Sequence, residues 1–130
     1  MTTEVARPEI PIEAIKETLL LLGYLNTRYG QHARAIVYYE LVSVLDPSNA
    51  GAWRGLATGR LATGDAERAA ECARKAVQHA ETPGDEAAAH LLLALALAAS
   101  SEADAAREHV DAYLATRPQA PDTVSEEDNA

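Results

Sequence analysis

The chain of 130 residues has one cysteine, one tryptophan and no phenylalanine. Its single cysteine, Cys72, excludes an internal disulfide framework and a zinc site built from cysteines. Aromatic residues make up only 5% of the chain, so alanine and leucine must supply the core. Basic residues are also scarce, since 11 Lys and Arg stand against 20 Asp and Glu, a formal net charge of −9. This balance argues against a nucleic acid partner, because neutralising phosphates requires a concentrated basic surface.

Long apolar runs are missing as well. The longest uninterrupted run covers residues 91–99, about half of the ~20 residues that a membrane-spanning helix needs. The first seven residues lack the basic and apolar regions of a secretory signal. We therefore expect a protein that does not insert into a membrane and that works in the cytoplasm.

The two ends of the chain differ from its middle. Residues 1–11 contain Pro8 and Pro11 and no periodic apolar pattern, which predicts a flexible lead. Residues 119–130 are polar and acidic, and such a segment cannot bury enough apolar area to offset the entropy of ordering it. We expect a disordered acidic tail there and one folded domain over residues 12–118.

The middle of the chain is rich in alanine, leucine, glutamate and arginine and lacks the alternation typical of exposed strands. Turn-forming residues, among them Gly30, Pro47 and Gly64, interrupt it at regular places. Asp65 and Asp85 stand where they could cap the fourth and fifth of the resulting helices. The pattern predicts an all-α chain with helices over residues 12–29, 32–45, 50–63, 66–80, 85–99 and 102–116.

The six expected helices repeat in pairs. The spacing from Gly30 to Gly64 equals the spacing from Ala35 to Ala69, so the first two pairs are related by one constant offset. A third copy follows at a slightly longer offset, which places Ala106 at the position of Ala69. The additional residues fall in an expected loop, where an insertion costs little.

This pattern resembles the tetratricopeptide repeat, a helix-turn-helix unit of about 34 residues whose signature is Trp, two residues, Leu-Gly, then Ala, three residues and an aromatic. Here Trp53 with Leu56-Ala57 matches the first part, and Ala35 with Tyr39 matches the second. The resemblance covers roughly residues 16–118. It implies a solenoid of three repeats with about six antiparallel helices, since one repeat cannot bury its own apolar face.

In such a solenoid the first helix of each repeat lines the concave side. The inward positions of these helices are mainly apolar here, with two cations and two threonine hydroxyls. Any single leucine among them would more often be a core residue. The predicted partner-binding groove comprises Leu20, Tyr24, Thr27, Arg28, Arg54, Thr58, Leu61, Leu91, Leu95 and Ala98.

The fifth predicted helix carries leucines around most of its circumference. A helix that is apolar on all sides must be covered on all sides, and we expect the fold to cover only one of them. A partner segment in the groove, or a second copy of the chain, is the simplest cover for the rest.

The sequence carries no motif for catalysis or metal binding. None of the four histidines lies four residues from another, and no phosphate-binding glycine loop or nucleophile elbow occurs. Cys72 could be a nucleophile and His90 a ligand, but burial inside the fold accounts better for both. We therefore expect a binding protein and not an enzyme, with no cofactor and no metal.

A narrower resemblance concerns the first repeat. Residues 19–25, Leu-Leu-Leu-Leu-Gly-Tyr-Leu, and residues 29–35, Tyr-Gly-Gln-His-Ala-Arg-Ala, look like the opening of the small repeat chaperones of bacterial type III secretion, the YscY-like group. The resemblance implies a chaperone that holds a small secreted export component and helps to present it to the export gate. Two other roles stay open: a general scaffold for protein assembly, and a structural protein that self-associates through its fifth helix.

Overall fold

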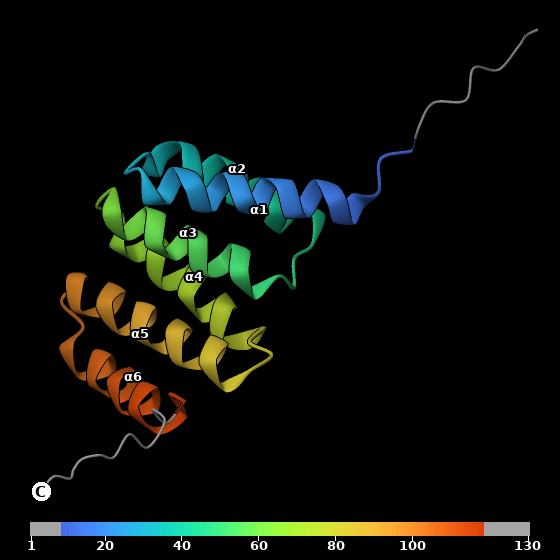
Figure 1. The fold of residues 1–130 in the computed structure, drawn as a ribbon. Helices are drawn as coiled ribbons and strands as arrows, with labels where there is room; N and C mark the ends of the chain where they lie inside the picture. The colour runs from blue at the N-terminus through green and yellow to red at the C-terminus, as the bar shows by residue number, and fades with distance from the viewer. Residues whose placement is uncertain (1–8, 119–130) are drawn as a thin grey trace, which may run out of the picture.

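The computed structural model describes residues 9–118, and this part of the chain folds into helices without a strand (Figure 1). The predictions for residues 1–8 and for the acidic tail lie outside the described residues. All six predicted helices are confirmed, with ends displaced by at most two residues. The helices are α1 (Ile12–Arg28), α2 (His32–Leu45), α3 (Ala50–Ala62), α4 (Ala66–Gln78), α5 (Pro83–Ala99) and α6 (Ala103–Thr116).

The N-terminal caps agree with the sequence at one helix and differ at another. Asp65 caps α4, because its carboxylate accepts a hydrogen bond of 3.2 Å from the backbone N–H of Arg68. The predicted cap Asp85 is wrong, since α5 begins earlier and the hydroxyl of Thr82 accepts the N–H of Asp85 at 3.0 Å. Pro83 then occupies the first helical position, where its missing N–H costs nothing.

The three hairpins turn in the same way. Gly30, Gly64 and Ser101 adopt left-handed φ values of 74°, 86° and 66° at equivalent positions of the three repeats. The amide that follows each of them closes the preceding helix by donating to a carbonyl five residues upstream, as is typical of a helix end with a left-handed residue. These hydrogen bonds of 2.7 to 2.8 Å run from Gln31 to Asn26, from Asp65 to Arg60 and from Glu102 to Leu97. The expected three-repeat solenoid is therefore present.

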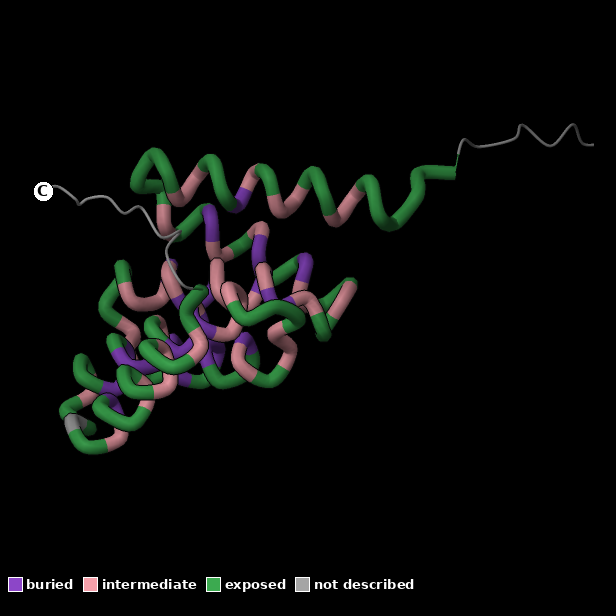
Figure 2. Tube along the Cα trace, turned by 60° about the horizontal axis from the view of Figure 1, so that its bottom comes forward, coloured by how far each residue is buried: buried purple, intermediate pink, exposed green. Residues whose placement is uncertain are grey.

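The core lies where the hairpins stack on one another. Its fully buried large side chains are Val42, Leu56, Leu93 and Leu97, and alanines fill most of the remaining positions. In Figure 2 buried residues gather between the hairpins, whereas α1 has a single buried residue, Gly23. Small side chains allow the helices to approach closely, so a core with few aromatic residues can still be densely packed.

The two outermost helices and α5 differ in how well they are covered. Among the described residues α6 packs against α5 alone, while α1 packs against α2 and α3. In contrast, α5 packs against α3, α4 and α6. The expectation that the fold covers only one side of this helix is therefore wrong. Leu93 and Leu97 are buried, and the large apolar side chains that remain exposed on α5 are Leu91 and Leu95.

Candidate partner-binding groove

An open groove of about 370 Å³ is formed mainly by α1, α3 and α5, the first helices of the three repeats. These helices follow one another from top to bottom in Figure 1. One side chain of α2 reaches the same groove from behind. The lining residues are Tyr24, Thr27, Tyr39, Gly51, Arg54, Gly55, Thr58, Ala88, Leu91 and Leu92.

The structure brings five of the predicted residues together in this groove, and they are Tyr24, Thr27, Arg54, Thr58 and Leu91. Leu95 and Ala98 are exposed further along α5. At the end of α1, Arg28 donates a hydrogen bond of 3.1 Å to the Tyr24 hydroxyl. Leu20 and Leu61 instead pack against the core cluster. The predicted set therefore divides into lining residues, neighbours of the groove and core residues.

Tyr39 forms the back of the groove, although it is not among the inward positions of the first helices of the repeats. Tyr39 belongs to α2, and its ring lies between two glycines, Gly23 of α1 and Gly55 of α3. A Cβ added at Gly55 would lie 2.4 Å from a ring carbon of Tyr39, so this site leaves no room for a side chain. Burial raises the pKa of the Tyr39 phenol, while Thr27 and Arg54 act in the opposite direction. Tyr39 is therefore a neutral aromatic surface at neutral pH.

Arg54 is the cationic group of the groove. Its Nη1 lies 3.3 Å from Oδ1 of Asp85, in the first turn of α5, and this ion pair ties α3 to α5. The same nitrogen is buried and has no aligned hydrogen bond with any residue in the described part of the chain. The side chain as a whole keeps about a quarter of its surface exposed. Arg54 can therefore offer its other guanidinium N–H groups to a carbonyl or carboxylate that enters the groove.

The two threonines contribute little polarity. The hydroxyl of Thr27 donates to the carbonyl of Gly23 at 2.9 Å, and that of Thr58 donates to the carbonyl of Arg54 at 3.0 Å. Because both hydroxyls are already bonded to their own helices, the methyl groups and the neighbouring Tyr24 and Leu91 dominate the lining. The groove is suited to burying an apolar segment and offers one charged anchor.

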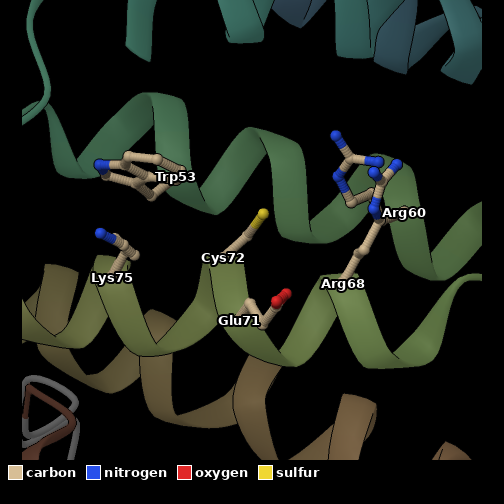
Figure 3. Close-up of a pocket in the computed structure, with 6 residues that line it drawn as sticks. All are labelled: Trp53, Arg60, Arg68, Glu71, Cys72 and Lys75. Carbon is tan, nitrogen blue, oxygen red and sulfur yellow. The ribbon is translucent and has the colours of Figure 1, made fainter. Parts of the chain in front are cut away.

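A second hollow lies between α3 and α4, with a volume of about 260 Å³ (Figure 3). Trp53 and Lys75 lie at one end, where the Lys75 ammonium is 5.4 Å from the centroid of the indole ring. Cys72 lies between them and Arg60. The prediction that Cys72 is a small buried residue is confirmed. Burial raises the pKa of its thiol, which therefore stays protonated and weakly nucleophilic.

Within the described residues there is no group of three or more His, Cys, Asp or Glu side chains that could hold a metal ion. None of the helices described for residues 9–118 combines the length and apolarity required to cross a membrane.

Comparisons with known proteins identify a fold and no family. No protein-family model matches the chain, and no curated protein matches its sequence. Among solved structures, it is similar to the type III secretion translocator chaperone SycD of Yersinia enterocolitica, crystallised as an alternative dimer, with a TM-score of 0.72. The two share 18% sequence identity over 79% of this chain and 76% of that chain. The chain therefore has the all-helical fold of a type III secretion chaperone.

Proposed function

We propose that this protein is a cytoplasmic chaperone of a type III secretion system, of the YscY-like kind, which shields an apolar segment of a small secreted partner. The fold that it shares with a secretion chaperone and the motif of the first repeat both support this role. The observation that carries the proposal is the apolar groove, in which exposed side chains of α1 and α5 flank the buried ring of Tyr39.

The groove offers a helical or extended segment both area and an anchor. Tyr24, Leu91 and Leu95 are about half exposed, so a partner that removes one of these side chains from water adds at most about half of the ~1.5–3 kcal/mol that burial of a fully exposed side chain contributes to binding. Leu91 and Leu95 are four residues apart on α5, so they present one side to a partner helix with the same spacing. Arg54 would pair with a carboxylate or carbonyl of that segment and fix its direction.

The sharpest test uses two double variants that are matched in exposure and spacing. Leu91 and Leu95 are 39% and 51% exposed on α5, and Val110 and Leu114 are 40% and 51% exposed at the same spacing on α6. In the first variant Leu91→Glu is combined with Leu95→Glu, and in the control Val110→Glu is combined with Leu114→Glu. Each is co-expressed with candidate small secreted proteins, and capture is measured by co-purification.

We expect the α5 variant to lose capture by about tenfold or more, while the α6 control captures the partner like the native chain. Circular dichroism verifies that both variants keep their helicity. Equal capture by the two variants would show that the groove does not bind the partner. Self-association through α5, the alternative role, predicts instead that the α5 variant changes the mass of the chain when it is alone in solution.

A further inference from the structure

The hollow between α3 and α4 lies on the opposite side of α3 from the groove. Arg60 lines the hollow and is two residues beyond Thr58, which lines the groove, so the two side chains are turned by about 200° from each other. No described residue lines both the hollow and the groove. A molecule bound in the hollow would therefore leave the groove open.

The hollow is present because the second repeat has a small residue at one position. Cys72 stands where the first repeat has Tyr38 and the third repeat has His109. In the third repeat His109 fills this place by stacking on His90, which corresponds to Trp53. The side chain of Cys72 is too short to do the same, so a space of about 260 Å³ remains beside the indole ring of Trp53.

The second repeat also surrounds this space with cations. Trp53 and Lys75 stand at one end of the hollow, and Arg60 and Arg68 stand at the other (Figure 3). Among the described lining residues the acidic one is Glu71. In a chain with a net charge of −9, the hollow is thus a local reversal of sign. The positions of the three cations are occupied by Asn26, Arg34 and Leu41 in the first repeat and by Leu97, Ala105 and Ala112 in the third.

The three cations keep capacity for a ligand. Nη2 of Arg60 lies 2.7 Å from Oε2 of Glu40, which leaves other N–H groups of the guanidinium able to donate elsewhere. Nε of Arg68 lies 3.9 Å from the carboxylate of Asp65, which is too long for a hydrogen bond, and the Arg68 side chain is 66% exposed. The Lys75 ammonium lies over the indole ring and makes no ion pair with any residue of the described range.

We propose that this hollow is a second binding site, which takes an acidic segment of a protein partner with one large apolar side chain between carboxylates. The apolar side chain packs against the indole of Trp53 in the space above Cys72. Carboxylates on one side of it pair with Arg60 and Arg68, and a carboxylate on the other side pairs with Lys75. A small inorganic anion would leave the indole wall uncovered, so the mixed lining favours a peptide.

The exposure of the cations sets the strength of this contact. Exposed ion pairs contribute little to binding, and the hollow buries one side chain, so we expect an isolated segment to bind with a dissociation constant of about 1 mM. A partner that holds the protein at a second place would raise the local concentration of the segment into this range. The site is independent of the proposed function, since it shares no described lining residue with the groove.

The single tryptophan of the chain makes the site observable. Nε1 of Trp53 donates a hydrogen bond of 2.8 Å to the carbonyl of Pro47, so its indole N–H should give one sharp resonance in a two-dimensional NMR spectrum. The probe is the peptide Asp-Glu-Phe-Glu-Asp with blocked ends, which should shift this resonance in a saturable way. The peptides Asn-Gln-Phe-Gln-Asn and Asp-Glu-Ala-Glu-Asp lack the charges and the ring, and each should bind about threefold more weakly or worse.

Variants of α4 test the charges with opposite signs. Lys75→Gln and Arg68→Gln each remove a cation and should raise the dissociation constant of the peptide about two- to fivefold. Glu71→Gln removes the acidic residue that lies between them in the sequence and should lower the dissociation constant by a similar factor. Arg74→Gln is the matched control and should change nothing, because Arg74 is exposed on the same helix but does not line the hollow.

Substitutions at Cys72 test the space. Cys72→Tyr introduces the residue type that the first repeat carries at this position, and it should fill the hollow and abolish binding although every cation stays. Cys72→Ala leaves the space open and should bind the peptide like the native chain. Circular dichroism verifies that both variants keep their helicity. If Cys72→Tyr loses helicity, Cys72→His, with the residue type of the third repeat, takes its place in the test.

Several results would overturn the proposal. They are a Trp53 resonance that does not shift with up to ~10 mM peptide, equal binding of the charged and uncharged peptides, equal effects of Lys75→Gln and Arg74→Gln, and native binding by a helical variant with the hollow filled. Inorganic phosphate that binds as strongly as the peptide would identify a simple anion site instead. The variant that combines Leu91→Glu with Leu95→Glu should bind the peptide like the native chain, so the hollow and the groove are tested separately.

Discussion

Nδ1 of His90 lies 3.1 Å from Nδ1 of His109, and the two rings stack with their centroids 5.3 Å apart. His90 is buried on α5, and His109 is half-buried on α6, so the pair joins the last two helices. A hydrogen bond between two Nδ1 atoms needs one donor and one acceptor. The contact is therefore compatible with two neutral rings or with one proton shared between them. If both rings were charged, both Nδ1 atoms would carry a proton and the two N–H groups would repel each other.

This pair predicts that the fold loses stability in mild acid. Burial, followed by the charge of His90, lowers the pKa of His109, with a smaller contribution from Arg74 and an opposing one from Glu108. Because the unfolded state, with a histidine pKa of about 6.5, binds more protons, stability is fully present above that pH and falls as the pH drops towards the folded-state pKa. Thermal unfolding should occur at a lower temperature at about pH 5.5 than at about pH 7.5.

The matched variant for this prediction is His109→Asn, which keeps a side-chain donor and acceptor near the position of Nδ1 but does not titrate. Its unfolding temperature should change less with pH than that of the native chain. Glu86 lies 3.6 Å from Nε2 of His90 and is present in both proteins, so it does not account for a difference between them. Identical pH profiles would show that His109 makes no such contribution.

Adding a methyl group at Gly55, which packs against the ring of Tyr39, should destabilise the fold. Gly55→Ala brings a Cβ to 2.4 Å from the ring, and overpacking of this kind typically costs about 1–3 kcal/mol. Gly51→Ala in the same helix is the control, because its nearest neighbour is the side chain of Asn49 at 3.2 Å. Urea unfolding should show a clear loss for the first variant and little change for the second. Equal stabilities would contradict the close packing of Tyr39 against α3.

The start of α5 should depend on Thr82 more than on Asp85. Thr82→Ala removes the side-chain cap and should lower the free energy of unfolding by about 1 kcal/mol. Asp85→Ala removes a partly exposed ion pair with Arg54 and should cost only a few tenths of a kcal/mol. The reverse order in denaturant titrations would support Asp85 as the cap.

Replacing Ser101 by glycine, the residue at the equivalent position of the first two hairpins, should make the third hairpin more stable. Ser101 adopts a φ of 66°, and the left-handed conformation costs a residue with a Cβ about 1–2 kcal/mol. Glycine avoids this cost but loses about 0.4–1 kcal/mol through the freedom of the unfolded chain. Ser101→Gly should therefore stabilise the protein modestly, and Gly64→Ser should destabilise it, as measured by thermal unfolding. A loss of stability in Ser101→Gly would mean that the serine compensates for its strain.

The sequence predicted the helices and their pairing because the signals for both are local. Gly30 and Gly64 occupy left-handed positions, and the third turn is placed by the offset from Gly64 to Ser101 together with the turn-forming pair Ser100 and Ser101. Asp85 was misplaced as a cap because a threonine before a proline is an equally good start, and spacing alone does not decide between them.

The groove was only half predictable because it depends on contacts between repeats. Periodicity places Leu20 and Leu61 close to the inward side, but both are partly buried and pack against the core cluster. Tyr39 was missed because it belongs to a second helix and reaches the groove through the space left by Gly23 and Gly55. A glycine inside a helix lowers the stability of that helix, so its presence needs a reason. Gly23 and Gly55 were therefore the signal in the sequence that a large side chain packs against them.

Because α6 packs against α5 alone among the described helices, it can open without breaking contacts between the others. Each helix from α2 to α5 is held by two or more others, and α6 can detach at the expense of one contact surface. Stacked repeats open most easily at their end helices, so the backbone amides of α6 should exchange hydrogen with solvent before those of the central helices α3 and α4. Opening of α6 should therefore leave the contacts among α1, α2, α3 and α4 intact, so the first two hairpins stay folded while it exchanges.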